Sequence, residues 1–457
     1  MTGRGMTRPP VSKRSTHKAS AHGKKVRGGD ARLAAIDLVE AVLITKTPLD
    51  ERLAWSMDRG LMKHLEPRDR AFARAIAATT LRRLGQIDAL LEARLQKALP
   101  SQAHKIRTLF RCSIAELAFI GTPAHATIST AVALADTFEK GYHYKGLLNA
   151  ILRRIAEDEG ASAAAQDAGK LNTPEWLWDR WSATYGEEGA RAIAEAQLEE
   201  PPLDISVKGD PADWAKDLDA EALPTGTLRR ASGGRIEDLP GFKSGAIWVQ
   251  DAAAAIPAKL LGDVSGQRVF DLCAAPGGKT MQLAAAGAEV TALDKSAKRL
   301  ARLSKNLKRT ELTAQLVNGD ASNWTPKAPA PFVLLDAPCS ATGTARRHPD
   351  VLRLKKPEDI SSLTETQTAL LDAATKLVAP GGTLVYCVCS LEREEGPDQI
   401  EAFLARHPEF SRGPIGAHEL GGLAELITPE GDLRTLPSHL AGKGGLDGFY
   451  AARLKKA

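Results

Sequence analysis

One stretch, residues 269–280 with the sequence VFDLCAAPGGKT, limits the possible folds more than any other part of the chain. A strand-like apolar run leads into a turn of small residues and then into an alanine-rich helix. Gly277 and Gly278 allow a close backbone approach, and the start of the helix presents unpaired N–H groups and a positive dipole end. A second apolar run ends at Asp294, 23 residues after Asp271, a spacing that suits a carboxylate on ribose hydroxyls in a doubly wound sheet. The stretch therefore predicts an α/β domain with a cofactor at the turn.

Two other glycine-rich motifs do not match this turn. A phosphate-binding P-loop requires glycine five positions before Gly278, where this chain has Cys273. A GxGxxG dinucleotide fingerprint is absent as well. These mismatches leave a cofactor of another kind, or a turn that binds no nucleotide.

Strand-like and helix-like segments alternate after residue 251, which predicts a mostly parallel sheet with helices on both faces. We assign residues 246–457 to this Rossmann-like domain and expect a final strand at 448–454 to be an antiparallel edge. The expected strands are 268–272, 289–293, 314–317, 331–335 and 382–388, and the expected helices are 278–286, 297–309, about 359–378 and 394–406.

Three further segments precede this domain. Apolar residues at helical spacing predict an all-α domain over residues 31–158, followed by a small, acidic, turn-like linker at 156–172. Residues 173–245 are expected to form a small α/β extension, whose first helix has Thr173 as its N-cap and packs its three tryptophans. Residues 1–30 hold eight Lys and Arg against a single acid and almost no large apolar side chains, which predicts a disordered basic tail with affinity for phosphates.

The rest of the composition restricts the cellular context. Five cysteines show no CxxC pair and no disulfide-like spacing, which favours a reducing compartment. The sequence has no apolar run long enough to span a bilayer and no signal-peptide pattern. We therefore expect a soluble, cytoplasmic and monomeric protein that is not membrane-bound and has no metal site.

Four acids lie at the ends of four successive predicted strands: Asp271, Asp294, Asp320 and Asp336. Ligands of such sheets bind outside the carboxyl ends of the strands, so these acids should meet at one site. They would repel a triphosphate but suit a cofactor with ribose hydroxyls, an adenine amino group and a cationic centre. S-adenosylmethionine has all three.

Two cysteines at neighbouring strand ends indicate which atom is methylated. A thiolate can add to C6 of a pyrimidine and so make C5 able to accept a methyl group. Cys339 and Cys389 are the candidates, with Lys279 and the pair Arg346-Arg347 available to favour a thiolate, whereas Cys387 is expected to be a buried hydrophobe. Spacing alone does not tell which of the two attacks. A basic run beside the site is expected to contact phosphates: Arg346, Arg347, Arg353, Lys355 and Lys356.

Two sets of motifs carry a resemblance to known families. The helical half contains EPRDRAF (66–72), TLRRL (80–84), PAHA (123–126) and KGLLNAILRR (145–154), and these resemble the NusB family. The second half contains DLCAAPGGKT, LDKSAKRLARLSKNLKR, GDA, LLDAPCSATGTARRHPDVLRLKK, LVYCVCSLEREEG and GGLDGFYAARL, in this order. Together they resemble the Sun family of RNA cytosine-C5 methyltransferases. The resemblance implies a NusB-like RNA-binding domain before a Rossmann-like S-adenosylmethionine-dependent methyltransferase domain. It also implies action on 16S ribosomal RNA, either free or within an assembling small subunit.

The same resemblance implies a role for each matching residue. Cys389 would be the nucleophile and Cys339 the thiol that helps to release the product, while Asp336 would hold or protonate the base near N3 with support from Lys279. Asp294 would bind the ribose hydroxyls and Asp320 the adenine side. The full set of expected cofactor contacts is Cys273, Ala274, Ala275, Pro276, Gly277, Gly278, Lys279, Asp294, Arg299, Asp320 and Asp336.

Two alternatives remain open from the sequence. Transfer RNA could replace ribosomal RNA as the substrate. The chain could also be a non-catalytic RNA-binding or antitermination protein, although the presence of both cysteines and of the strand-end acids argues against this hypothesis.

Overall fold

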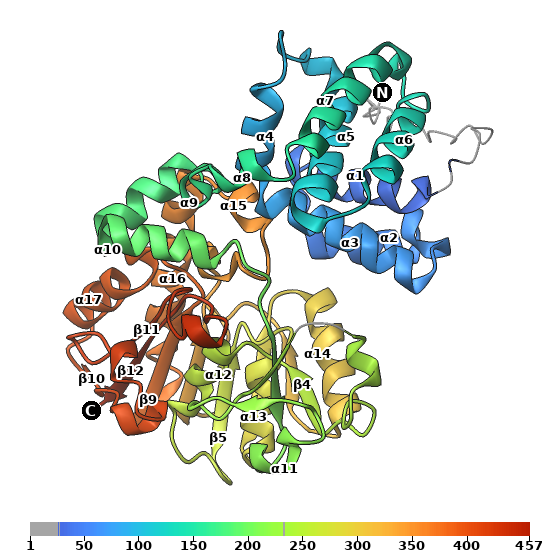
Figure 1. The fold of residues 1–457 in the computed structure, drawn as a ribbon. Helices are drawn as coiled ribbons and strands as arrows, with labels where there is room; N and C mark the ends of the chain where they lie inside the picture. Colours follow the sequence, from blue (N-terminus) through green and yellow to red (C-terminus); the bar gives the residue numbers. More distant parts are fainter. Residues whose placement is uncertain (1–25, 27, 232–233) are drawn as a thin grey trace, which may run out of the picture.

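A computed structural model describes residue 26 and residues 28–231 and 234–457 of the chain. The helical domain stands above the sheet-containing part, and α9, α10 and α15 lie between the two (Figure 1). The predicted basic tail at 1–30 falls mostly outside the described residues. No helix in the described part of the chain is both long and apolar enough to cross a membrane.

The first domain is all-α, as the sequence predicts. Its helices enclose one apolar core, and a buried ion pair joins α1 to the segment after α5, with Arg32 Nε donating to Glu116 Oε1 at 2.9 Å. The elements are α1 Gly29–Leu43, α2 Leu49–Asp58, η1 Leu61–His64, α3 Pro67–Arg82, α4 Leu84–Glu92, η2 Ser101–Ala103, α5 His104–Ala115, η3 Glu116–Ile120, α6 Ala124–Ala135, η4 Gly141–Tyr144 and α7 Lys145–Glu157.

The segment predicted as a linker is structured. It contains two short helices, α8 Ala161–Ala164 and α9 Ala168–Asn172. The buried side chain of Asn172 accepts from the N–H groups of Gly85 and Gln86 at 3.0 and 3.2 Å, and so joins α9 to the start of α4. Small and acidic residues indicated a turn, but these specific hydrogen bonds hold the segment against the helical domain.

The long helix α10, Glu175–Ala196, packs on the sheet-containing half of the chain. Leu177 and Trp181 are buried against Ala345, Leu352 and Leu391, which confirms that the tryptophans serve packing. The predicted N-cap is wrong, since the helix begins at Glu175 and the residue before it is proline.

The extension is a small four-stranded antiparallel sheet with one short helix, and its last strand lies beyond residue 245, the predicted end of this segment. Its strands lie in the order β2-β3-β1-β4, and its own core surrounds Ile205, Leu228 and Ile247. The elements are β1 Leu203–Val207, α11 Pro211–Ala215, β2 Glu221–Ala222, β3 Leu228–Arg230, η5 Ile236–Asp238 and β4 Ile247–Val249.

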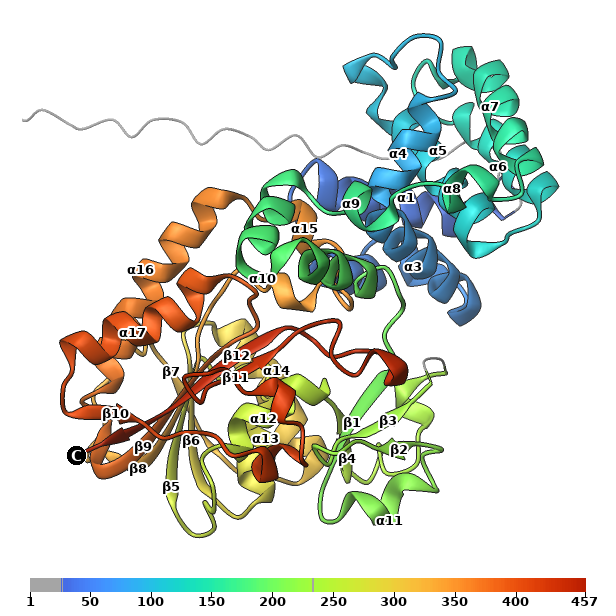
Figure 2. The ribbon, with the colours of Figure 1, turned by 60° about the vertical axis from the view of Figure 1, so that its left-hand side comes forward.

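The large sheet has the strand order β10-β12-β9-β8-β5-β6-β7, and β9 to β7 in this order are parallel. Helices α12, α13 and α14 cover one face and α16 and α17 the other (Figure 2). The strands are β5 Arg268–Leu272, β6 Glu289–Asp294, β7 Gln315–Asn318, β8 Ala330–Asp336, β9 Val378–Val388, β10 Phe410–Arg412, β11 Leu433–Thr435 and β12 Phe449–Lys456; the helices are α12 Ala252–Lys259, α13 Gly278–Ala285, α14 Ala297–Thr310, η6 Thr342–Thr344, α15 Val351–Leu354, α16 Pro357–Ala374, η7 Arg393–Glu395, α17 Pro397–Arg406, η8 Ala417–Leu420, η9 Ala424–Leu426 and η10 Ala441–Lys443.

Two features of this sheet decide where a site can form. The chain builds β5, β6 and β7 outward in one direction and then returns to place β8 on the other side of β5, so the crevice at their carboxyl ends is the topological switch point. The strand β12 is antiparallel, as predicted, but it is not at an edge: it lies between β9 and β10. The short strand β10 forms the edge, and its three residues pair with the side of β12 that faces away from β9.

Candidate active site

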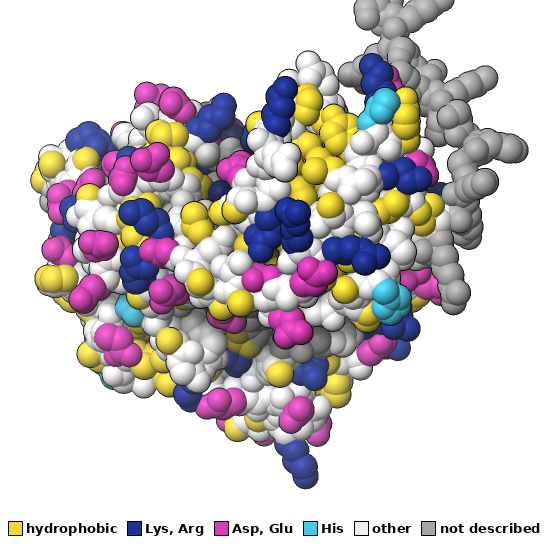
Figure 3. Space-filling view, turned by 45° about the horizontal axis from the view of Figure 1, so that its top comes forward, with side chains coloured by type: hydrophobic (Ala, Val, Ile, Leu, Met, Phe, Trp, Pro, Cys, Tyr) yellow, Lys and Arg dark blue, Asp and Glu magenta, His cyan; other side chains and the backbone are white. Residues whose placement is uncertain are grey.

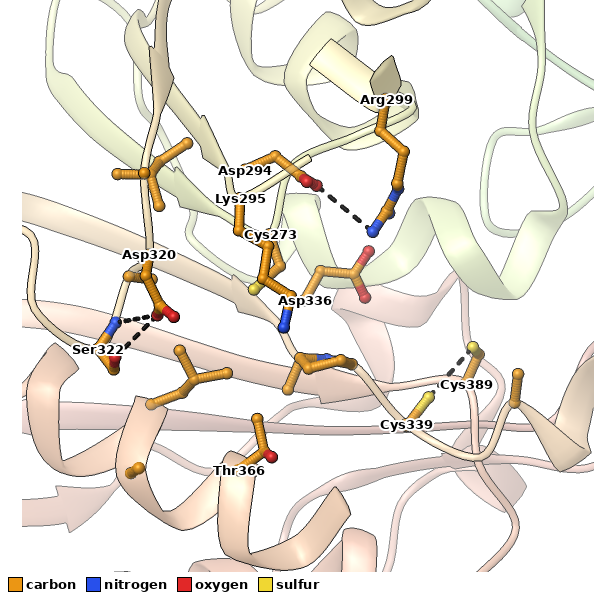
Figure 4. Close-up of a pocket in the computed structure, with 18 residues that line it drawn as sticks. Cys273, Asp294, Lys295, Arg299, Asp320, Ser322, Asp336, Cys339, Thr366 and Cys389 are labelled. Atoms are coloured by element: carbon orange, nitrogen blue, oxygen red, sulfur yellow. Dashed lines mark hydrogen bonds and ion pairs between the residues drawn. The ribbon is translucent and has the colours of Figure 1, made fainter. Parts of the chain in front are cut away.

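Two thiols meet at the ends of two neighbouring parallel strands. Cys339 lies in the loop after β8 and Cys389 directly follows β9, and their Sγ atoms are 3.4 Å apart (Figure 4). Cys387 is fully buried in the layer beneath α12 and α13, as predicted for a structural cysteine. The register of β8 and β9 thus brings together two side chains that are 50 residues apart in the sequence.

The surroundings of the two thiols differ. Lys279 and Arg347 are close enough to Cys389 for their charges to interact with its sulfur. The hydrogen bond to Cys389 and burial hold the pKa of the Cys339 thiol well above its ordinary value, and the charge of Glu395 acts in the same direction. Burial and the neighbouring sulfur thus disfavour a thiolate at Cys339, while two cations lie near Cys389.

An ion pair lies beside the two sulfurs. Lys279, at the start of α13, donates to Asp336 Oδ2 at 2.9 Å, and its ammonium lies 5.0 Å from the centre of the Phe449 ring. Burial alone would lower the pKa of Lys279, but the negative charge of Asp336 raises it. Lys279 therefore stays cationic, and it can stabilise negative charge on groups that enter the space next to Asp336.

A cavity of about 370 Å³ opens at the switch point, on one side of the cysteines. Asp294 ends β6 and accepts from the N–H groups of Ala275 and Ser296 at 3.2 and 2.8 Å. Asp320 follows β7 and accepts from the N–H and hydroxyl of Ser322, hydrogen bonds that lower its pKa. Both carboxylates thus point into the cavity from its far side (Figure 4). Its polar and thiol lining is Cys273, Asp294, Lys295, Arg299, Asp320, Ser322, Asp336, Cys339, Thr366 and Cys389.

The fourth strand-end acid lies apart from this lining. Asp271 is fully buried beneath the turn, where Thr280 donates to its Oδ2 atom at 2.5 Å and its Oδ1 atom has no hydrogen-bond partner. Burial raises the pKa of Asp271 to about 7 and that of the Cys273 thiol to about 12. Asp271 therefore does not line the cavity, but a cationic group bound near it would offset the free-energy cost of burying its carboxylate.

The glycine-containing turn separates this cavity from a second space. Of the residues predicted to contact a cofactor, Cys273, Asp294, Arg299, Asp320 and Asp336 line the cavity. Ala274, Pro276, Gly278 and Lys279 line a cleft of about 790 Å³ on the other side, and Ala275 and Gly277 line neither space. The backbone oxygens of Ala275 and Pro276 are occupied by Arg299 and Asn306. The turn is therefore the wall between the two spaces.

The cleft is formed by two domains. Lys46, Pro48 and Asp50 of the helical domain face Lys279 and Arg347 of the sheet domain across it. Cys389, Asp336 and Ala341 line both the cleft and the cavity. A molecule in the cleft and a molecule in the cavity would therefore meet at Cys389 and Asp336.

The basic run beside the site serves mainly structure, so the prediction of phosphate contacts is wrong for two of its members. Arg346 is 2% exposed and pairs with Asp251 and Asp447 at 3.1 and 3.4 Å. The guanidinium of Arg353 donates to the backbone oxygen of Asn172 at 2.7 Å. Two buried carboxylates far away in the sequence pair with Arg346, and a distant backbone oxygen binds Arg353. A local run of charge gives no sign of such partners.

Two of the three remaining basic residues of the run line the cleft. Arg347 binds Asp447 but also lines the cleft, and Lys355 lines the same cleft. Lys356 precedes α16 and its N–H group donates to Asp359 at 2.9 Å, which begins that helix. Among the described residues, no three His, Cys, Asp or Glu side chains are grouped in a way that could hold a metal ion.

The face of the molecule seen from the helical domain has no uniform charge. Lys and Arg side chains are spread among acidic ones over it, with apolar side chains gathered toward the upper right of the view (Figure 3). A ligand recognised on this face would therefore be selected by local contacts and shape more than by a broad positive field.

Comparison with known proteins gives two family matches. Residues 258–455 match the model of the 16S rRNA methyltransferase RsmB/F family, and residues 29–157 match that of the NusB family. The ribosomal RNA small subunit methyltransferase B of Pseudomonas putida is 38% identical over 93% of this chain and 98% of its own length. The protein of the same name from Cronobacter sakazakii is 34% identical over 87% of this chain and 92% of its own length.

Two solved structures extend the comparison. The crystal structure of PH0851 superposes with a TM-score of 0.71 and 25% identity, over 93% of this chain and 98% of that chain. A methyltransferase homologue from Pyrococcus horikoshii has a TM-score of 0.51 and 26% identity, over 61% of this chain and 94% of that one.

Proposed function

We propose, since the chain belongs to the RsmB/F family of 16S ribosomal RNA methyltransferases, that it transfers a methyl group from S-adenosylmethionine to C5 of a cytosine in 16S ribosomal RNA. The family membership predicted from the motifs is confirmed, as is the fold of a NusB-type domain before a methyltransferase domain. The chain is thus an RNA methyltransferase. The substrate base, the cofactor contacts and the roles of the cysteines are the content of the proposal.

One observation supports the proposal most: a pair of thiols 3.4 Å apart on the boundary between two spaces. The cavity has the volume and the carboxylates for an adenosine-containing donor, and the interdomain cleft is wide enough for a nucleotide of an RNA strand. Cys389 lines both, so its sulfur can reach a base that faces the donor. A non-catalytic RNA-binding protein would have no use for this arrangement.

The chain's own residues suit each step of the reaction. The Cys389 sulfur attacks C6 of the cytosine beside the positive charges of Lys279 and Arg347, while Asp336 holds or protonates the base near N3. The bound cofactor supplies the methyl group that C5 accepts. Loss of the C5 proton then allows the bond from C6 to Cys389 to break, a step that Cys339 assists from 3.4 Å away.

The carboxylates around the cavity match the hydrogen-bond donors and the positive charges of the cofactor. Asp294 could accept from ribose hydroxyls, and Asp320 could accept from the adenine amino group, since both carboxylates line the cavity. The unpaired Oδ1 atom of buried Asp271 and the Asp336 carboxylate supply negative charge on the side of a sulfonium and an ammonium. No phosphate is needed to account for any of these groups.

The RNA would lie in the cleft between the helical and the sheet domain. A base must leave its stack to reach Cys389, which favours an open strand or a loop. All groups named here come from one chain, so we keep the monomer as our expectation, acting in the cytoplasm where ribosomal RNA is made. The names of the relatives favour ribosomal RNA over transfer RNA.

The test uses 16S ribosomal RNA that lacks the modification, with labelled S-adenosylmethionine. Wild-type protein should label cytosine C5, Cys389→Ala should abolish labelling, and Cys339→Ala should accumulate a covalent RNA adduct that survives a denaturing gel. An adduct in Cys389→Ala and none in Cys339→Ala would reverse the two roles. Transfer RNA offered in parallel tests the other substrate.

A further inference from the structure

One buried carboxylate connects the loops that carry the two cysteines. Glu395 lies at the end of η7, and its side chain is fully buried. Its neighbours Glu392 and Glu394 both pair with Arg180, whereas no ion pair to Glu395 is found among the described residues. A buried carboxylate without a cation is costly unless several hydrogen bonds stabilise its charge.

Those hydrogen bonds come from the residues that follow the cysteines. Ser340 follows Cys339, and its N–H group donates to Glu395 Oε1 at 2.8 Å. The hydroxyls of Ser340 and Ser390 both donate to Glu395 Oε2, and the two hydroxyl oxygens are 3.0 Å apart. Ser390 follows Cys389. One carboxyl group thus binds both cysteine loops at the same point.

A fourth donor closes the network around Cys339. The amide nitrogen of Gln367, on α16, donates to Glu395 Oε1 at 3.0 Å and to the backbone oxygen of Pro338 at 2.9 Å. Pro338 and Ser340 flank Cys339, so the loop is held on both sides of the thiol. Hydrogen bonds to a charged acceptor are stronger than those between neutral groups, which makes this network a rigid one.

We propose that Glu395 is a positioning residue that sets the 3.4 Å spacing of the Cys339 and Cys389 sulfurs. It lines neither the cavity nor the cleft, and its hydrogen bonds reach the two cysteine loops at Ser340 and Ser390. The inference rests on the function proposed above, in which one thiol attacks and the other assists release. Both must then reach the same base at once.

The spacing can be measured without RNA or cofactor. Phenylarsine oxide bonds to two thiols at once when their sulfur atoms lie at about this separation, so its affinity reports the spacing; Cys339→Ser gives the baseline for binding through one thiol. Glu395→Gln keeps the size of the side chain but turns one acceptor into a donor. It should weaken the affinity at least tenfold, and Glu395→Asp should give an intermediate loss.

The matched control is Glu394→Gln, the same substitution one residue away on a half-exposed side chain. Its affinity for the arsenical and its turnover should stay within twofold of wild type. With RNA and S-adenosylmethionine, Glu395→Gln should lower kcat at least tenfold while KM for RNA changes less than threefold.

Each outcome decides the proposal. Equal arsenical affinity in folded Glu395→Gln and in wild type would overturn it. If that variant does not fold, Ser390→Ala, which removes a single donor, should still weaken the affinity about threefold, and no change there would also overturn it. A wild type that binds the arsenical tightly but methylates no RNA would refute the proposed function instead, and the arsenical comparison would still test the spacing.

Discussion

Two adjacent glycines in the turn after β5 should differ in how far alanine at each position lowers the stability of the domain. Gly277 has φ of +105°, and a Cβ atom placed on it would lie 2.0 Å from Leu303 Cδ1 of α14. Gly278 is the first residue of α13, and a Cβ atom there would meet the Gln250 side chain at 3.4 Å, an ordinary contact. We therefore expect Gly277→Ala to destabilise the catalytic domain and Gly278→Ala to be tolerated.

The magnitude follows from two contributions. A left-handed backbone conformation costs an alanine about 1 to 2 kcal/mol relative to glycine. Forcing a methyl group into the packed Leu303 side chain costs about 1 to 3 kcal/mol. The sum is about 2 to 5 kcal/mol, which for a domain of this size lowers the unfolding midpoint by roughly 4 to 20 °C. Gly278→Ala should change the midpoint by no more than about 2 °C, because alanine is accepted in a helix.

Thermal unfolding of the two variants and of wild type, at one pH and without ligand, measures the difference. A double-mutant cycle with Leu303→Ala separates the clash from the backbone strain, since the shortened side chain leaves room for the new methyl group. The coupling should be about 1 to 3 kcal/mol, the part of the cost assigned to the clash. Equal midpoints for Gly277→Ala and Gly278→Ala would refute the reasoning.

Three other perturbations have definite expected outcomes. Burial raises the pKa of Asp271 to about 7, so the unfolded chain loses this proton at lower pH than the folded chain does. The free energy of unfolding should therefore fall by up to about 1.4 kcal/mol per pH unit between about pH 4 and 7 and then level off. Urea unfolding of ligand-free Asp271→Asn should lack this slope. Arg346→Met should cost about 3 to 5 kcal/mol in the same assay, because Asp251 and Asp447 would lose their buried cation; a loss below 1 kcal/mol would contradict this. Lys46→Ala should raise KM for RNA severalfold at unchanged kcat and cofactor affinity, and an unchanged KM would place the RNA outside the cleft.

The elements of the catalytic domain could be predicted because their signal is local. Strand 268–272 and helix 297–309 agree with β5 and α14 to within a residue, since buried parallel strands and amphipathic helices have clear hydrophobic periods. The position of β12 could not be predicted in this way. The partners of an antiparallel strand follow from no local pattern, and only the complete sheet shows that β12 lies between β9 and β10.

The meeting of the two thiols could be predicted from the sequence, but the residues that hold their loops could not. Cys339 and Cys389 end successive strands, so the topology rule brings them together. Glu395 and the partners of Arg346 were missed, because a buried polar network depends on contacts between residues far apart in the chain. The pattern LEREEG contains three acids, and nothing in the spacing tells that Glu392 and Glu395 turn inward while Glu394 stays half-exposed.

The insertion of β12 beside β9 has a consequence for protein synthesis. A ribosome that has made β9 and Cys389, which follows it, must still add about sixty residues before β12 exists, as the numbering of the two strands shows. Until then, the backbone groups of β9 on that side have no partner and the strand exposes an edge. The helical domain encloses its own core and can fold while the rest emerges. The helical domain should thus be folded well before the sheet that carries the two cysteines is complete.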